Sequence, residues 1–114
     1  MITMYGIPNC DTIKKAKKWL EQTGIEFQFH DYRKQGIDQA LMQDFCQRFG
    51  WQQVLNKRGT TYRQLTQQQK DDLDESSAIS LLIEYPAMIK RPIVISATSG
   101  MIGFKAEQYA DFFK

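Results

Sequence analysis

Cys10 is the residue of this sequence best placed to do chemistry, because it stands where one structural element ends and the next begins. A short apolar segment precedes it, turn-forming residues 6–9 follow that segment, and a helical pattern starts at the cysteine. Unpaired N–H groups and the positive end of a helix dipole stabilise a thiolate there, and cysteines so placed in redox proteins have pKa values of about 3.5 to 7.5. Lys14 and Lys15, one turn further on, would add positive potential. The alternative is a small buried cysteine in a turn; the coincidence of strand end, Gly/Pro loop and helix start favours a reactive thiol.

The second cysteine and the only histidine limit the mechanisms that are open to Cys10. Residue 13, where a C-x-x-C partner of Cys10 would stand, is isoleucine, so an internal disulfide at that spacing is impossible. Cys46 falls on the apolar side of another predicted helix, which favours a core cysteine over a resolving thiol. His30 has no second histidine to pair with, so we expect a structural role for it and no metal site. A mechanism with one cysteine then needs a thiol from outside the chain.

Two arginines stand in contrasting segments and are candidates for holding an anion. Arg58 lies in the run Asn-Lys-Arg-Gly-Thr, and Arg91 lies in Ile-Lys-Arg-Pro. The planar guanidinium fork suits carboxylates and oxyanions. Surface salt bridges are the alternative for any arginine, and the residue types by themselves leave both readings open.

The apolar pattern predicts the elements that hold Cys10. Residues 2–5 read as a short strand, and from residue 10 to residue 23 apolar side chains recur at helical spacing before Gly24, which is placed to end the helix. Residues 25–32 alternate apolar and polar side chains, as in a half-buried strand. This is a β-α-β unit, whose two strands should run parallel.

The middle of the chain, about residues 37–90, has a helical pattern. This pattern predicts an insertion made of helices. Asp38 is a plausible N-cap for a helix that Gly50 ends, and further helical stretches are expected after Thr66 and over residues 78–83.

The last part of the chain returns to strands. Residues 93–95 form a β-branched run, and after a turn at 98–100 a second short strand through Phe104 should pair with it as a hairpin. A helix over residues 106–113 closes the chain. The order β-α-β, helical insertion, β-β-α predicts an α/β thioredoxin-like fold: a small mixed four-stranded sheet flanked by helices, in one domain over residues 1–114.

Composition excludes several classes of protein. The net charge of +2 is too small to predict nucleic-acid binding, and the lysines of residues 14–18 read as a solvated helix face. No apolar stretch approaches the roughly 20 residues of a membrane span, and the N-terminus has no secretory pattern. We therefore expect a cytoplasmic protein with neither membrane nor nucleic-acid partners.

Three segments together resemble the arsenate-reductase-like family, which includes ArsC and Spx proteins, and within it the YffB-type group. The segments are Tyr-Gly-Ile-Pro-Asn-Cys-Asp-Thr-Ile-Lys-Lys-Ala over residues 5–16, Leu-Asn-Lys-Arg-Gly-Thr-Thr-Tyr over 55–62, and Ile-Lys-Arg-Pro-Ile-Val over 89–94. The resemblance implies a nucleophilic Cys10, with Arg58 and Arg91 completing the catalytic set.

The resemblance also implies a ligand site and a partner. Asn9, Lys14 and Pro92 would join the two arginines in binding substrate, and the Arg91–Pro92 peptide would be cis. No cofactor is expected to be tightly bound. Glutathione would be the reducing co-substrate, with glutaredoxin as the alternative reductant and a small disulfide or an oxyanion as substrate.

Two departures from the arsenate reductases bear on function. The glutaredoxin-coupled enzymes have a histidine four residues before the cysteine, where this chain has Gly6, and a third arginine where it has Gly103 and Phe104, with Lys105 as the nearest cation. The Spx-type regulators bind the RNA polymerase α subunit and often carry a C-x-x-C switch, which this chain lacks. The resemblance therefore points to a glutathione-dependent thiol reductase, with a polymerase-binding regulator and an arsenate reductase as alternatives.

Overall fold

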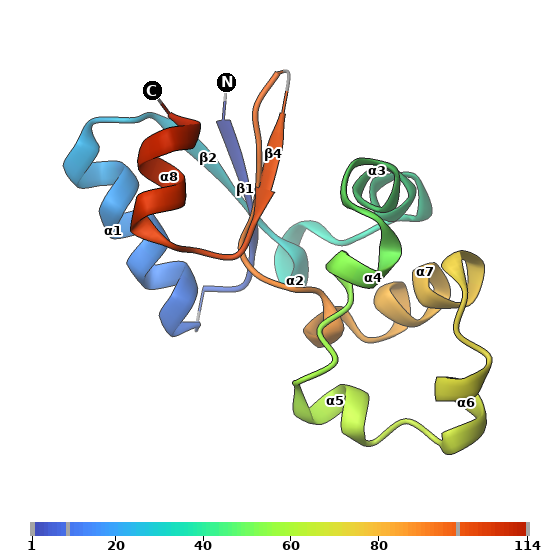
Figure 1. The fold of residues 1–114 in the computed structure, drawn as a ribbon. Coiled ribbons are helices and arrows are strands. Elements are labelled where there is room, and N and C mark those ends of the chain that lie inside the picture. The colour runs from blue at the N-terminus through green and yellow to red at the C-terminus, as the bar shows by residue number, and fades with distance from the viewer. Residues whose placement is uncertain (1, 9, 98, 114) are drawn as a thin grey trace. The chain divides into compact units, whose positions relative to one another are not determined.

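A computed structural model describes residues 2–8, 10–97 and 99–113 (Figure 1). The chain forms two compact units. The first contains the residues up to Gly36 together with those from Arg91 onward, and the second contains Ile37–Lys90. The expectation of a single domain with an insertion over about 37–90 stays a prediction.

The first unit is built on a four-stranded mixed sheet in the order β2-β1-β3-β4. The strands are β1 (Ile2–Gly6), β2 (Phe27–Asp31), β3 (Ile93–Ile95) and β4 (Gly100–Ile102). β1 runs parallel to β2 and antiparallel to β3, and β3 and β4 form the expected hairpin. The thioredoxin-like fold is therefore confirmed, although β2 ends before Tyr32 and β4 ends two residues before Phe104.

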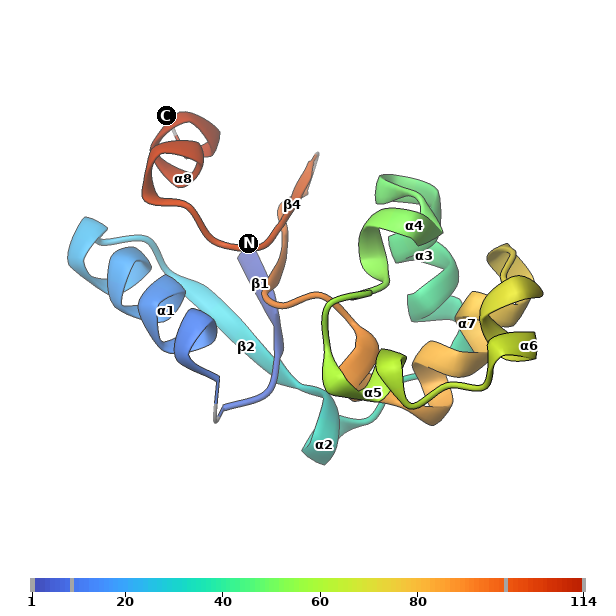
Figure 2. The same ribbon diagram turned by 60° about the horizontal axis from the view of Figure 1, so that its bottom comes forward.

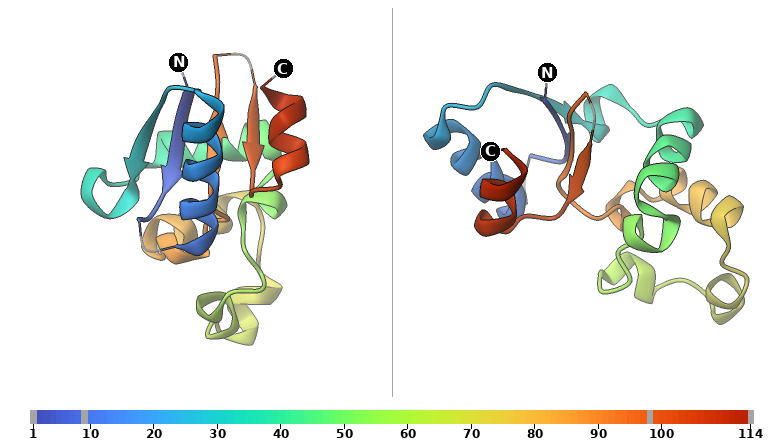
Figure 3. Two further views of the ribbon diagram at one scale, coloured as in Figure 1. Left: turned by 90° about the vertical axis from the view of Figure 1, so that its left-hand side faces the viewer. Right: turned by 45° about the horizontal axis from the view of Figure 1, so that its top comes forward.

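Helices α1 (Asp11–Thr23) and α8 (Ala106–Phe112) cover one face of this sheet, as Figure 3 shows. α1 buries Ile13, Ala16 and Leu20 against the sheet, which is the stripe that its sequence spacing predicts. Gly24 ends α1 in the left-handed conformation, with φ of 79°. Trp19 of α1 meets Tyr109 of α8 edge to face, with ring centroids 5.5 Å apart.

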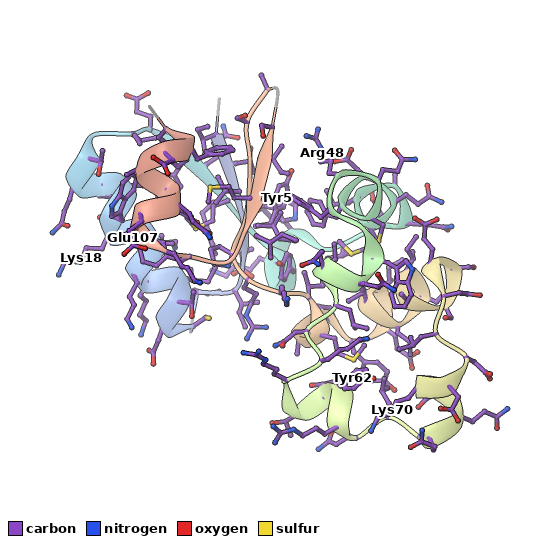
Figure 4. All side chains as sticks on the ribbon, viewed as in Figure 1. Tyr5, Lys18, Arg48, Tyr62, Lys70 and Glu107 are labelled. Atoms are coloured by element: carbon purple, nitrogen blue, oxygen red, sulfur yellow. The ribbon has the colours of Figure 1, made fainter. Side chains whose placement is uncertain are left out.

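The second unit is helical, as its sequence predicts. Its elements are α3 (Gln39–Phe49), α4 (Trp51–Val54), α5 (Thr60–Arg63), α6 (Gln67–Asp71), α7 (Glu75–Glu84) and the 3-10 helix η1 (Pro86–Met88). α3 packs against α4 and α7 (Figure 2). Asp38 caps α3 by accepting a 2.8 Å hydrogen bond from the Leu41 N–H. In Figure 4, Lys70 of α6 extends toward the ring of Tyr62 in α5, and its Nζ lies 5.3 Å from the ring centroid.

The short helices α2 (Tyr32–Gln35), α4, α5 and η1 carry too few residues for a periodic pattern, so sequence analysis missed them. Among the described residues, no helix is both long and apolar enough to span a membrane.

Candidate active site around Cys10

One edge of the sheet in the first unit collects three side chains that can act together. β1 and β2 run parallel, so their carboxyl ends share this edge, and the antiparallel β3 begins there. Cys10 follows β1 after a short loop, Tyr32 directly follows β2, and Arg91 comes two residues before β3. The strand directions therefore bring together residues that are far apart in sequence.

Cys10 is the N-cap of α1 and has an extended backbone, so it lies at the helix N-terminus as predicted. Its side chain is half-buried. Burial raises the pKa of its thiol, but hydrogen bonds from the Ile13 N–H, the Arg91 side chain and the Thr12 N–H, together with the positive charge of Arg91, outweigh burial and lower the pKa overall. The environment favours a thiolate.

Arg91 is half-buried, and the peptide that joins it to Pro92 is cis, as expected. It is the cation that lowers the pKa of Cys10. Lys14, which sequence analysis placed at the site, is exposed on α1, and Pro92 is buried, with its carbonyl accepting a 2.8 Å hydrogen bond from the Gly103 N–H. Asn9 lies outside the described residues.

Tyr32 is a member of this site that sequence analysis missed. Its side chain is only 3% exposed, and in the described part of the chain its hydroxyl has no hydrogen-bond partner. Burial raises the pKa of Tyr32, the charge of Arg91 lowers it, and a thiolate at Cys10 raises it. The signal that could have found it is its place directly after a strand parallel to the one that leads to Cys10.

Gly6, at the end of β1, packs against the first turn of α1. A Cβ at residue 6 would collide with Cδ1 of Ile13 and lie 3.2 Å from its Cγ1 and 3.7 Å from Cε1 of Phe29. Ile13 is fully buried and cannot swing into solvent. The Ile13 N–H, which helps to lower the pKa of Cys10, can therefore keep its position only if residue 6 has no side chain.

Arg58 belongs to the second unit, where it lines a basic hollow of about 310 Å³. The lining residues are Gln52, Leu55, Asn56, Lys57, Arg58 and Lys90. Three of these residues carry a positive charge and none is acidic. Such a set favours an anionic group such as a carboxylate.

Backbone hydrogen bonds fix the walls of this basic hollow. The Asn56 N–H donates to the Met88 carbonyl at 2.7 Å, and the Lys90 N–H donates to the Val54 carbonyl at 2.8 Å. The side chain of Asn56 then accepts from the Arg58 N–H at 3.1 Å, which orders the loop that carries the arginine.

The other two candidate residues, Cys46 and His30, make contacts of a structural kind. Cys46 is 3% exposed in α3, where burial and then the charge of Glu75 raise the pKa of its thiol, so the interpretation as a core cysteine is confirmed. His30 lies 3.0 Å from the Gly36 carbonyl through Nε2, and its ring centroid lies 4.9 Å from that of Tyr5. Among the described residues, no group of three or more His, Cys, Asp and Glu side chains is arranged to hold a metal ion.

The fold of the first unit is thioredoxin-like, and a cysteine with a lowered pKa lies at the start of its first helix. The chain belongs to the ArsC family, whose model matches residues 5–112. The family includes arsenate reductases.

Individual relatives cover nearly the whole chain. A Haemophilus influenzae protein, described as uncharacterized, is 47% identical over 113 residues, with 99% of each chain covered. The solved structure of a protein named YffB is 45% identical, with 97% of each chain covered and a TM-score of 0.93. The global transcriptional regulator Spx of Streptococcus pneumoniae is 26% identical, and the match covers 98% of this chain and 85% of the regulator.

Proposed function

We propose that this protein is a glutathione-dependent thiol reductase that works through the single nucleophile Cys10. The observation that carries the proposal is the environment of that thiol: two backbone N–H groups and Arg91 hold its pKa down against the effect of burial. The thiolate is the attacking species in thiol–disulfide exchange.

The reaction has two exchange steps. The Cys10 thiolate attacks the glutathione sulfur of a mixed disulfide; a bond from Cys10 to glutathione forms, the original S–S bond breaks, and the second thiol leaves as a thiolate that takes a proton from solvent. A second glutathione thiolate then attacks the glutathione sulfur bound to Cys10. Glutathione disulfide leaves, the electron pair of the broken bond stays on Cys10, and the substrate has gained two electrons.

An external thiol is needed because the chain offers no reactive cysteine to resolve the Cys10 adduct. Residue 13 is isoleucine, and Cys46 is buried with a raised pKa. Arg91 would hold the anionic group of the ligand next to Cys10, and Arg58 of the basic hollow would bind a carboxylate.

Arsenate reduction is the less favoured alternative, because the site lacks the residues that the resemblance associates with it. A side chain at residue 6 would collide with Ile13, so a histidine has no room there without a shift of α1. Lys105 stands near the place of a third arginine, and the loss of one donor aimed at developing charge typically costs about 100-fold or more in rate.

A regulator that binds the RNA polymerase α subunit is the rival from another class, favoured by the similarity to the Spx regulators. In that case Cys10 would be at most a redox sensor. The absence of a second cysteine at residue 13 weakens this reading.

The test is an assay with glutathione and a small mixed disulfide, run beside arsenate reduction and a pull-down with the purified polymerase α subunit. We expect disulfide turnover that Cys10→Ser abolishes and Cys46→Ala retains, with little arsenate reduction. Unchanged turnover in Cys10→Ser, or arsenate turnover faster than that of the disulfide, would refute the proposal. Stoichiometric capture of the α subunit without any disulfide turnover would favour the regulator.

A further inference from the structure

Tyr32 presents a polar group that the fold of the first unit does not use. Its side chain is 3% exposed, and in the described part of the chain its hydroxyl meets no hydrogen-bond partner. Burying a hydroxyl without a partner is destabilising, so such groups are rare in native proteins and call for an explanation. The fold therefore carries a destabilising group at the edge of the sheet where Cys10 lies.

Tyr109 is a second buried tyrosine of the same unit, and it serves as a comparison for Tyr32. Its side chain is fully buried, and its hydroxyl donates a 3.2 Å hydrogen bond to the Gly103 carbonyl. Rings from α1, from the loop after β4 and from Phe113 just after α8 surround it, with Phe104 at 4.8 Å. The two residues thus differ in the feature that matters: one buried hydroxyl is paired and the other is not.

The surroundings of Tyr32 point to Cys10. Tyr32 follows β2, whose last residue Asp31 is in register with Gly6 of β1, and β1 leads to Cys10. The charges of Arg91 and of a Cys10 thiolate both act on the pKa of Tyr32. Burial raises that pKa above its usual range, so the hydroxyl stays protonated at neutral pH and remains a hydrogen-bond donor.

We propose that the Tyr32 hydroxyl donates a hydrogen bond to the sulfur of Cys10 as negative charge returns to it, and so stabilises the leaving thiolate in the second exchange step. This inference rests on the proposed function. When glutathione attacks the Cys10–glutathione disulfide, the new S–S bond forms between the two glutathione sulfurs and the electron pair of the broken bond goes to the Cys10 sulfur. The hydroxyl keeps its proton throughout, so no proton acceptor is needed.

This role fits a buried donor, since the Cys10 sulfur belongs to the protein itself and no substrate has to reach the hydroxyl. Donors fixed in advance at the place where charge develops stabilise the transition state more than the ground state. Catalytic hydrogen bonds in unliganded structures are often long and tighten only during the reaction.

The test compares Tyr32→Phe with the matched control Tyr109→Phe. For Tyr32→Phe we expect kcat to fall about tenfold or more with KM near that of the wild type, because one hydrogen bond to a charged group is lost, while the melting temperature stays equal or rises. For Tyr109→Phe we expect the opposite: unchanged kcat and a melting temperature lower by roughly 4 °C. A merely structural tyrosine would lower stability and activity together.

The outcomes separate this inference from the proposed function. Wild-type kcat in Tyr32→Phe, with Cys10→Ser inactive, overturns the role of Tyr32 and leaves the reductase standing. If the wild type has no Cys10-dependent turnover, the reductase proposal fails, and the pH profile of Cys10 alkylation decides the inference. A shift of that profile to higher pH in Tyr32→Phe supports the hydrogen bond to Cys10, and an identical profile overturns it.

Discussion

Replacing Gly6 by alanine tests how the fold prepares Cys10. The added Cβ collides with Cδ1 of Ile13, a fully buried residue whose N–H helps to lower the pKa of Cys10. Overpacking of this kind costs about 1–3 kcal/mol, or roughly 4–12 °C in melting temperature for a chain of this size. Because the buried Ile13 must shift to make room, we also expect the Cys10 thiolate to lose part of its hydrogen bonding and to react more slowly with iodoacetamide at pH 6.

Ile13→Val supplies the control, since valine lacks the Cδ1 atom of the clash. Alone, this substitution should cost about 0.5–1.5 kcal/mol. In the double variant the new Cβ keeps only the milder contact with Cγ1, so the combined cost should be at least about 1 kcal/mol less than the sum of the two single costs. Thermal melting and the alkylation rate at pH 6 measure both effects. Strict additivity, or a Gly6→Ala variant with wild-type stability and alkylation, would show that the contact between residue 6 and Ile13 does not prepare Cys10.

Three further predictions concern Arg91, Cys46 and Asp74. Arg91→Gln removes a hydrogen bond and a positive charge that lower the pKa of Cys10 while burial still raises it, so alkylation at pH 6 should slow several-fold and approach the wild-type rate above pH 9; equal rates at pH 6 would contradict this. Cys46→Ala should leave disulfide turnover intact, and in the wild type Cys46 should react with iodoacetamide only at high pH or on unfolding, since burial and Glu75 raise its pKa; labelling at pH 6 before Cys10 would reverse the assignment. Asp74 is the N-cap of α7, where its side chain accepts a hydrogen bond from the Ser77 N–H. The Ser77 backbone and side chain lower the pKa of Asp74, so its carboxylate stabilises the fold above the ordinary aspartate pKa, and this contribution is lost as pH falls through the lowered value. Asp74→Asn should therefore show a smaller drop in melting temperature between pH 7 and pH 3, and an unchanged drop would count against this N-cap.

The elements that a local pattern specifies could be predicted from the sequence. The α1 stripe, the Gly24 cap, the parallel strand pair and the placement of Cys10 at a helix N-terminus all depend on residues close in sequence. The cap of α3 by Asp38 is equally local.

What sequence reasoning missed depends on contacts between distant segments. Tyr32 and Cys10 share an edge only because β1 and β2 run parallel in a particular register. The basic hollow exists because the backbone at Asn56 is hydrogen-bonded to the backbone at Met88. This contact joins residues more than 30 positions apart, and no local pattern in either segment predicts it. The lysines near Cys10 were expected to help its thiolate, whereas Arg91, 81 residues away, is the cation that lowers its pKa.

The proposed reductase reaction requires Cys10 to form a glutathione adduct that glutathione itself releases. The most direct test is the intact mass of the protein after brief treatment with glutathione disulfide at pH 7, followed by peptide mapping of the modified cysteine. We expect one glutathionyl group on Cys10, none on Cys46, loss of the adduct when reduced glutathione is added, and no adduct in Cys10→Ser. An adduct on Cys46 with Cys10 unmodified, or a Cys10 adduct that glutathione does not remove, would contradict it.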